Sequence, residues 1–581
     1  MGLISVYPNR RWMVASAAPE ATAARLREAL GCSRLAALLL ANRGIESPEQ
    51  AQAFLNPGFE QLADPLLLPD AATAVGRLRL ALERRERIYV HGDYDGDGVT
   101  STALWARLLE KLGADVRAHV PHRRRDGYDL RSKFVAHARS EGAALILTTD
   151  CGVQRYDEVE EAREAGIDVI VTDHHEPGPR LPRAVAVVNP RRANSRYPFA
   201  GLAGVGVAYR VGEALVRDLG MPLEGYRRAF GDLAAIGTIT DVMALLGENR
   251  VIVKHGLEAL RDTRKPGLRA LMASAGVRLD RALSAHAVGF QLGPRINAVG
   301  RLHDARTALA LLLTREPGEA SRLAAALEEA NGQRREEENY ILSEAAADAD
   351  RQCEAGRGCI VVVGSSWHAG VIGIVANRLV DRCCRPAIVI ALEEGAEEGR
   401  GSARSIRPFD LYDAISECGG LLTEFGGHSH AAGFGIRRSR VAEFADAMNA
   451  RAAQRLTAED FVPTVTCDAE VDAAQVTEAL AEELQRFEPW GHRNEEPVLV
   501  SRGLRVQECR RIGRDQTHLK LRVQDASGRA LDAIRWGGAE LDRSLRAGMS
   551  VDLCYSPQSN AYNGRTSVQL LLRDAPRPAE P

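Results

Sequence analysis

The chain is poor in the features that mark membrane, secreted and disulfide-stabilised proteins. Its 10 cysteines in 581 residues include no C-x-x-C pair, so neither a structural zinc site nor a disulfide framework is indicated. No apolar run is long enough to span a bilayer, and the N-terminus lacks the charged and then apolar pattern of a signal peptide. We therefore expect a cytoplasmic protein with no attachment to a membrane.

The sequence also lacks an excess of positive charge. Its net charge of -3 gives no support to nucleic-acid binding, so such a partner would need a locally positive surface. Residues 500–574 contain 13 Lys and Arg against 8 Asp and Glu, an excess of 5. Arginines cluster at 123–125, 191–192 and 510–511, although a solvated face is the commoner role of each cluster alone. The C-terminal region is thus the basic part of the chain.

The length of the chain predicts three or four domains, because 581 residues exceed what one core can hold. Residues 1–80 read as helical, and we find no chemistry there. From residue 88 onward, short apolar runs alternate with amphipathic helical stretches, which predicts a parallel sheet with helices on both faces. The predicted strands lie at 88–90, 116–120, 144–147, 169–171 and 184–188.

The first predicted strand leads into a short stretch that contains His91, Asp93, Asp95 and Asp97. Three carboxylates this close repel one another unless cations lie between them, which favours a divalent metal site over a solvated acidic loop. A calcium loop of the EF-hand type is disfavoured because its twelfth position would be Leu104 instead of a glutamate. The imidazole of His91 also favours a metal such as Mn²⁺ or Zn²⁺ over calcium.

More candidate ligands follow the later strands. Asp150 follows the third predicted strand, and Asp173, His174 and His175 follow the fourth, while Asp241 lies further along. A single aspartate after a strand is more often a helix cap than a ligand. Because ligands of open parallel sheets bind at the carboxyl ends of the strands, we expect these residues to meet at one edge.

In this order, the motifs resemble those of the DHH phosphoesterase superfamily, and within it the RecJ family of bacterial exonucleases specific for single-stranded DNA. The resemblance runs from about residue 80 to the C-terminus. Besides the acidic loop and the Asp173 to His175 motif, it rests on the stretches 201–209, 293–301, 366–370, 401–406 and 426–433.

The resemblance implies two divalent metal ions, Mn²⁺ or Mg²⁺, bridged by one carboxylate. The first ion is expected to be held by His91, Asp95 and Asp150. The second is expected to be held by Asp97, Asp150, His174 and Asp241. Two such ions clamp a phosphoryl group and activate a water molecule for phosphodiester hydrolysis.

The same resemblance assigns two catalytic residues near the metals. Asp173 is expected to orient His174, and His175 to contact the phosphate. Asp93 is expected only to brace the loop. The substrate is expected to be bound by a second set of residues: Arg295, Arg301, Arg404, Gly426, Gly427 and His428. Which arginine reads the 5′ end stays open.

The predicted fold is α/β, with a parallel-sheet DHH domain, a smaller α/β DHH-associated domain beyond a long helix, and a C-terminal OB-like β-barrel. Trp536, Tyr555 and Tyr562 are candidates for stacking bases, although core packing is favoured for each. The expected boundaries are 1–80 (helical segment), 81–250 (DHH domain), 251–315 (helical extension), 316–356 (connecting helix), 357–455 (DHH-associated domain) and 456–581 (barrel).

Two positions depart from the family pattern. Gly96 stands where alanine is usual, and Arg493 stands where glycine is usual. Neither change removes a predicted ligand, so we expect only the local loop geometry to differ.

The function that the resemblance implies is a cytoplasmic, metal-dependent 5′→3′ exonuclease that hydrolyses single-stranded DNA to 5′-mononucleotides in recombination and repair. The implied partners are a helicase and single-strand-binding protein, and we expect a monomer. One alternative is a phosphodiesterase of short RNA or cyclic dinucleotides, disfavoured because such relatives are shorter and lack the barrel. The other is a catalytically inactive scaffold, disfavoured because every ligand position is filled.

Overall fold

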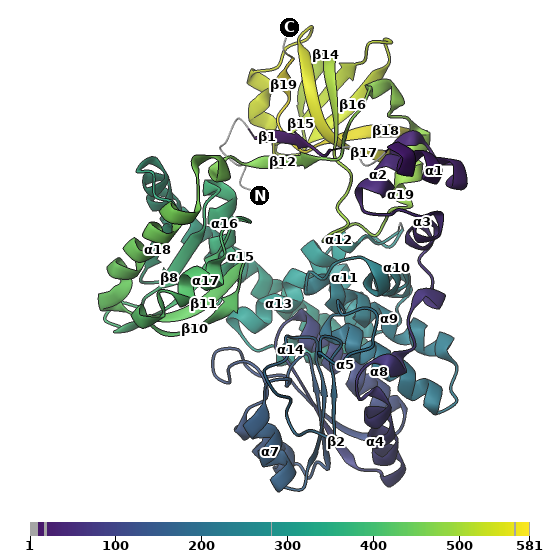
Figure 1. Cartoon of the computed structure of the whole chain (residues 1–581), viewed down its shortest axis with the longest axis vertical. Coiled ribbons are helices and arrows are strands. Elements are labelled where there is room, and N and C mark those ends of the chain that lie inside the picture. The colour runs from purple at the N-terminus through teal and green to yellow at the C-terminus, as the bar shows by residue number, and fades with distance from the viewer. Residues whose placement is uncertain (1–9, 17–19, 281, 563–564, 580–581) are drawn as a thin grey trace. The chain divides into compact units, whose positions relative to one another are not determined.

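The computed structural model of the chain describes residues 10–16, 20–280, 282–562 and 565–579. These residues form two compact units. The first comprises residues 1–52, 335–486 and 496–581, and the second comprises residues 53–334 and 487–495. Figure 1 labels the elements of both units.

The second unit contains a five-stranded sheet in which every strand is parallel to its neighbours, in the order β3-β2-β4-β5-β6. Its strands are β2 (Arg87–Gly92), β3 (Asp115–His119), β4 (Leu145–Thr149), β5 (Asp168–Thr172) and β6 (Ala186–Val188). The helices that accompany it are α4 (Ala71–Arg84), α5 (Gly96–Lys111), α6 (Ser132–Ser140), α7 (Tyr156–Glu164) and α8 (Gly204–Asp218).

Alternate residues of β2 enter two different cores. Ile88 and Val90 pack in a cluster with residues of α4, α5 and α8, whereas Tyr89 packs with residues of α6 and α7. Successive side chains of a strand point to opposite faces, so both faces of the sheet are covered. The parallel sheet with helices on both faces, predicted from the sequence, is confirmed.

A helical layer completes the second unit. Leu245 N–H donates to the carbonyl of His492 (2.9 Å), and Phe487 packs edge-on against Phe54 (5.6 Å between ring centroids). Residues 487–495 therefore belong to this unit although they lie far along the chain. The helices of the layer are α9 (Leu223–Thr240), α10 (Gly247–Arg261), α11 (Pro266–Ser274), α12 (Ala285–Ala287), a π turn η3 (Val288–Leu292), α13 (Gly293–Leu302) and α14 (Arg306–Leu313).

The long helix expected at 316–356 is α15 (Pro317–Glu354), 38 residues in length. After it, the first unit contains a mixed five-stranded sheet in the order β10-β11-β9-β8-β7, in which only β7 and β8 are parallel. Its elements are β7 (Ile360–Gly364), α16 (Ile372–Cys383), β8 (Ala387–Ala391), β9 (Glu398–Arg404), α17 (Leu411–Ser416), β10 (Leu422–His428), β11 (Ala431–Arg437) and α18 (Val441–Arg455).

The C-terminal strands, at the yellow end of the colour scale in Figure 1, close into a five-stranded barrel. The order β14-β15-β16-β18-β17 returns to its start because β17 also pairs with β14, which confirms the predicted OB-like barrel. Its strands are β14 (Leu499–Ile512), β15 (His518–Gln524), β16 (Ala530–Arg535), β17 (Ser550–Tyr562) and β18 (Arg565–Leu572). Smaller elements beside it are β12 (Thr464–Cys467), β13 (Ala469–Glu470), α19 (Glu478–Gln485) and β19 (Arg577–Pro578).

The three aromatic candidates of the barrel have different surroundings. Tyr555 is fully buried and its hydroxyl lies 2.7 Å from that of Ser501, so it is a core residue. Trp536 is 60% exposed. The side chain of Tyr562 lies outside the described residues.

The N-terminal segment was expected to be helical, and it contains α1 (Glu20–Leu30), α2 (Arg34–Asn42) and α3 (Pro48–Leu55). It also contains an unexpected strand, β1 (Arg11–Val14), which pairs in parallel with β12. Trp12 Nε1 donates to Asp574 (2.7 Å), and the Arg577 guanidinium lies 3.9 Å from the ring centroid of Trp12. A four-residue strand whose partner is some 450 residues away leaves no local pattern in the sequence.

Among the described residues, no helix combines the length and the apolar character needed to cross a membrane.

Candidate metal centre

The acidic loop joins β2 to α5, and its turn is built by Asp95. The Asp95 carboxylate accepts hydrogen bonds from the N–H groups of Asp97 and Gly98 (both 3.0 Å), so it caps α5. A Cβ on Gly98 would lie 2.5 Å from the backbone oxygen of Asp93. Only glycine allows this close approach, and the turn therefore brings the three aspartates together at the start of the helix.

Asp97 points away from its own helix toward the start of α8. Its carboxylate accepts hydrogen bonds from the N–H groups of Gly204 (2.7 Å) and Val205 (2.8 Å). A Cβ on Gly204 would lie 2.5 Å from Oδ1 of Asp150. Asp150 itself has a positive φ of 60°, a conformation that aspartate and asparagine tolerate better than most residues. The N-terminus of α8 therefore contacts both the loop that follows β2 and the loop that follows β4.

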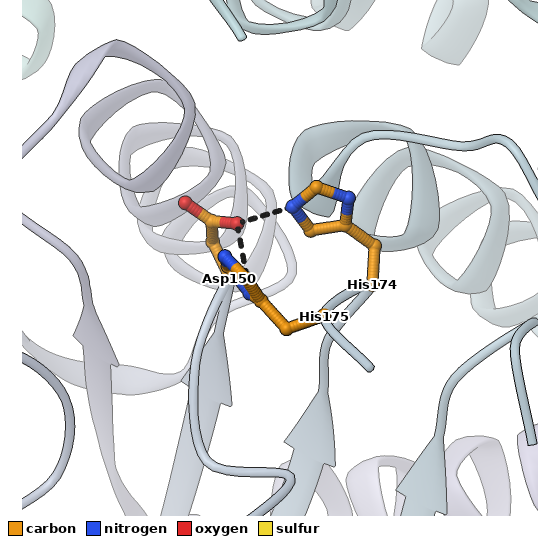
Figure 2. Close-up of side chains that lie close together, drawn as sticks. All are labelled: Asp150, His174 and His175. Carbon is orange, nitrogen blue, oxygen red and sulfur yellow. Dashed lines mark ion pairs between the residues drawn. The ribbon is translucent and has the colours of Figure 1, made fainter. Parts of the chain in front are cut away.

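His174 lies at the centre of the predicted ligands. Its Nε2 is 3.1 Å from Asp150 Oδ1, 3.6 Å from Asp241 Oδ2 and 3.8 Å from Asp97 Oδ2. Figure 2 shows dashed lines from one carboxylate oxygen of Asp150 to a ring nitrogen of His174 and to a ring nitrogen of His175. Ligand atoms lie within 4.8 Å of one another in three groups: Asp97, His174 and Asp241; Asp150, His174 and His175; and Asp93, Asp95 and Asp150.

Among the described residues, these groups contain every predicted ligand except His91. They also contain Asp93, which was expected only to brace the loop, and His175, which was expected to contact the phosphate. His91 lies on β2, two residues after Tyr89, and its ring packs against His119 (5.5 Å) and Phe134 (4.7 Å between centroids). The two-residue period of the strand points His91 toward this buried face, where both of its ring nitrogens are buried without a hydrogen-bond partner among the described residues. Its role as a metal ligand stays a prediction.

Asp173 was expected to orient His174, but the ring that it holds is that of His175. Nδ1 of His175 lies 2.8 Å from Asp173 Oδ1, whereas His174 reaches that carboxylate through its backbone N–H (2.7 Å). Burial disfavours the charged imidazole, but the hydrogen bond and the negative charge of Asp173 outweigh it and raise the pKa of His175 to about 9. Without bound metal, these interactions favour the charged form of the His175 imidazole at neutral pH.

The electrostatics of the site fit divalent cations. Burial, followed by repulsion from Asp95, raises the pKa of Asp97 to about 7. Burial and neighbouring carboxylates also raise the pKa values of Asp93, Asp150 and Asp241. Oδ1 of Asp150 is buried and has no hydrogen-bond partner among the described residues. Clustered carboxylates are the ligands that Mg²⁺ and Mn²⁺ prefer, and the imidazole of His174, whose pKa burial lowers to about 3, adds a neutral nitrogen donor.

A cavity of about 310 Å³ opens beside these acids. The Tyr128 hydroxyl there lies 3.4 Å from the ring nitrogens of His175, and the Arg123 guanidinium lies 5.0 Å from the centroid of Tyr94. Arg123 was predicted only as part of a solvated cluster, and no pattern in the sequence marked either tyrosine. The cavity is lined by Asp93, Tyr94, Asp95, Arg123, Tyr128, His175, Thr240, Asn297, Gly300 and Arg301.

Three family models match the chain in order. They are the DHH family N-terminal domain over residues 87–238, the DHHA1 domain over 356–454 and the RecJ OB domain over 467–574. The chain is also 37% identical over 550 residues, 95% of its length, to the single-stranded-DNA-specific exonuclease RecJ of Bacillus subtilis, of which it covers 69%. The chain belongs to the RecJ family.

Other members confirm the assignment. The Escherichia coli RecJ exonuclease is 34% identical over 560 residues, 92% of this chain and 94% of that protein. The crystal structure of RecJ in complex with Mn²⁺ from Thermus thermophilus matches with a TM-score of 0.83 and 33% identity, covering 98% of this chain and 80% of that one. A second RecJ structure from that organism is in complex with Mg²⁺ (TM-score 0.77).

The remaining substrate residues predicted from the RecJ resemblance occupy different settings. Arg301 lines the cavity. Arg295 Nε lies 2.5 Å from Glu328, in an ion pair. Arg404 and His428 lie in the first unit, at the ends of β9 and β10. Gly427 has a φ of 151°, and a Cβ there would lie 2.3 Å from the carbonyl oxygen of Ala431.

Arg404 has a neighbour that the sequence reasoning overlooked. Its Nη1 lies 3.3 Å from the hydroxyl of Ser402. A Cβ on Gly373, in the first turn of α16, would lie 3.0 Å from Ser402 Oγ and 3.1 Å from Arg404 Nη2. A guanidinium, a hydroxyl and a helix N-terminus thus converge, which is a favourable setting for a phosphate.

The two departures from the RecJ pattern have structural explanations. A Cβ on Gly96 would lie 2.6 Å from the hydroxyl of Thr240, so alanine does not fit here unless Thr240 moves. Arg493 has a φ of 59°, in the region that glycine occupies without strain. The backbone of the 487–495 loop therefore keeps a glycine conformation although the glycine is absent.

Proposed function

We propose that this chain is a two-metal exonuclease that degrades single-stranded DNA in the 5′→3′ direction and releases 5′-mononucleotides. The convergence of five aspartates and His174 at the sheet edge of a RecJ-family chain carries the proposal. RecJ relatives are single-stranded-DNA-specific exonucleases by name, and two related structures are complexes with Mn²⁺ and Mg²⁺.

In this proposal one cation is held by Asp97, His174 and Asp241, and the other by Asp93, Asp95 and Asp150. Asp150 reaches both groups, since its Oδ1 also lies 3.1 Å from His174 Nε2. When bound, the two cations activate the attacking water and stabilise the charge that develops on the phosphate. Asp97 remains anchored by the N–H groups at the start of α8, which fixes its position.

The side chains of the cavity then orient the substrate. His175, positively charged and held by Asp173, donates a hydrogen bond from Nε2 to an oxygen of the scissile phosphate. Arg301, on the wall of the same cavity, binds the adjacent phosphate. Arg295 supports α13 through Glu328 and is assigned no substrate contact.

The 5′ end is assigned to Arg404. Its guanidinium, Ser402 and the first turn of α16 bind the terminal phosphate, while Gly426, Gly427 and His428 bind the backbone. The partners, a helicase and single-strand-binding protein, come from the family resemblance alone. The cytoplasmic location expected from the cysteine pattern and the monomeric state are also parts of the proposal.

A single-stranded DNA oligomer labelled at its 5′ or 3′ end, with Mn²⁺ or with chelator, tests the proposal. We expect a labelled mononucleotide to be released at once from the 5′ end and release to stop with chelator. First release from the 3′ end would contradict the direction. A preference for dinucleotides would favour the small-substrate phosphodiesterase, and no cleavage would favour the inactive scaffold.

A further inference from the structure

Phe290 is exposed to an extent that packing does not explain. Its side chain is 71% exposed, and that of Val242 is 64% exposed, the two highest values for large apolar side chains in the described part of the chain. The exposed ring of His286 stacks on Phe290, with centroids 4.4 Å apart and planes inclined by 23°. The imidazole of His286 therefore lies against one face of the Phe290 ring, and we call this exposed stacked pair the aromatic surface.

The backbone under these side chains is irregular. Phe290 lies in the π turn η3 between α12 and α13, and π turns inside helices occur frequently at functional sites. Val242 has a φ of 56°, which is an outlier for a β-branched residue. It immediately follows Asp241, one of the proposed metal ligands. Strained backbone of this kind persists where the surrounding structure holds it, and it clusters at active sites.

Both residues flank the end of α9 that borders the cavity. A Cβ on Gly289 would lie 3.4 Å from Ile239, and one on Gly293 would lie 2.6 Å from Cγ2 of Thr240. Thr240 lines the cavity, as do Asn297 and Arg301 of α13, the helix that continues from η3. The aromatic surface and the wall of the cavity thus belong to one continuous helical segment.

We propose that Phe290, supported by His286, is a platform on which one base of the single strand stacks while a neighbouring phosphate occupies the cavity. This inference rests on the proposed function. Stacking on an aromatic ring tolerates any base, because every base has a π face. A base in a duplex is already paired and stacked on both sides, so the platform favours an unpaired strand.

Stacking of a base predicts a defect that depends on the base itself. The experiment uses single-stranded oligomers that carry one abasic nucleotide at successive positions from the 5′ end, with Mn²⁺ and the full-length chain. Values of KM and kcat are measured for the wild type, Phe290→Ala and Phe290→Tyr. Leu67→Ala, which removes another exposed apolar side chain of the same unit, is the matched control.

We expect one abasic position to raise the KM of the wild type by about tenfold, the order that stacking of one base supplies. Phe290→Ala should raise KM on intact DNA by a similar factor, and the KM of this variant should no longer depend on the position of the abasic nucleotide. Phe290→Tyr should behave as the wild type, and kcat should change little. Leu67→Ala should leave both constants and the abasic dependence unchanged.

Two results would overturn the platform alone. One is an abasic dependence that persists in Phe290→Ala, and the other is a loss of kcat in Phe290→Ala that is equal on intact and abasic DNA, because that loss indicates a structural role. A wild-type chain that hydrolyses none of the oligomers would instead overturn the proposed function, and with it the platform.

Discussion

Asp150 has three unusual structural features. Its backbone is in the left-handed region, its side chain is buried, and its carboxylate lies among other carboxylates and beside His174. A buried carboxylate without counter-charge destabilises the fold unless it gains a cation. The residue is therefore placed for binding metal and is unfavourable for stability without it.

Replacement of Asp150 by asparagine separates these two effects. Asparagine also tolerates the positive φ, so Asp150→Asn removes the charge and keeps the backbone conformation. The rate of hydrolysis should fall by more than about 100-fold, which exceeds the effect of removing a residue that only supports a metal ligand. Without metal, the variant should unfold at the same temperature as the wild type or higher. Asp157→Asn, at an exposed aspartate on α7, is the control. Full activity in Asp150→Asn would contradict the bridging role.

The pKa of Asp97 predicts how stability depends on pH when metal is absent. Its folded pKa is about 7, raised from an ordinary value of 3.8, so the folded state holds the proton more tightly than the unfolded state. The contribution of Asp97 to the free energy of unfolding should therefore decrease as the pH rises from about 4 to about 7 and stay constant above that range, where His175, whose pKa is raised to about 9, still titrates. Urea unfolding with chelator measures this, and Asp97→Asn should remove part of the decrease. An equal slope in the variant would contradict the assignment.

Arg493 carries a backbone cost that can be measured. A non-glycine residue in the left-handed region costs about 1–2 kcal/mol, and the extra freedom of an unfolded glycine costs about 0.5–1 kcal/mol. Arg493→Gly should therefore stabilise the chain by about 0.5–1 kcal/mol in urea unfolding. Arg493→Ala, which removes the side chain and keeps the strain, should show no such gain. An equal increase in the free energy of unfolding in both variants would show that the side chain of Arg493, and not its backbone conformation, lowers stability.

At the scale of elements, the described part of the barrel has one large exposed aromatic side chain, that of Trp536, in a region with an excess of positive charge. Trp536 follows β16, and the ring of His518 at the start of β15 lies edge-on to it (4.8 Å). Strands β15 and β16 are neighbours, so the two rings share one region of the barrel surface. This is the setting of a stacking site for single strands.

Trp536→Ala should weaken binding of a long single strand by about tenfold, the order of one lost stacking contact. Trp536→Phe should retain most of the affinity. Tyr555→Phe is the matched control, because the hydroxyl of Tyr555 contacts Ser501 in the core and its loss should lower stability without changing DNA binding. Fluorescence anisotropy with chelator measures the affinities. Equal binding by Trp536→Ala and the wild type would exclude the ring from the DNA site.

At the scale of the whole molecule, neither of the two compact units is continuous in sequence. Residues 487–495 belong to the unit that holds the metal centre, although the residues on both sides of them belong to the other. Deletion of everything after residue 460 would therefore remove packing from the catalytic unit as well as the barrel. Point variants are the sharper test of each unit.

The division into units also predicts which residues bound metal protects from hydrogen exchange. Because ligand that binds only the folded state stabilises it, Mn²⁺ should slow hydrogen exchange in peptides of residues 53–334, most strongly around Asp95, Asp150, His174 and Asp241. Peptides of the sheet β7–β11 should exchange at the same rate with and without Mn²⁺. Hydrogen-exchange mass spectrometry resolves both sets. Protection confined to the first unit would contradict the location of the metal centre.

Local patterns in the sequence predict the parallel sheet, the long helix and the barrel, because hydrophobic periodicity reports local structure directly. Asp150 and His174 each follow a strand, and the carboxyl ends of parallel strands meet at one edge of the sheet, which is why the two were expected to lie together. The roles of Asp150, His174 and Asp241 as metal ligands come from the RecJ resemblance and stay predictions.

The positions of individual side chains needed the folded structure. The type and spacing of residues do not specify that His91 packs on the buried face of β2 while Asp93 joins the acidic group, or that Asp173 holds the ring of His175 instead of that of His174. The same holds for the pairing of β1 with β12, for Ser402 beside Arg404, and for the exposed ring of Phe290. Each arises from contacts between segments that lie far apart in the chain, or from exposure, and both exist only once the chain has folded.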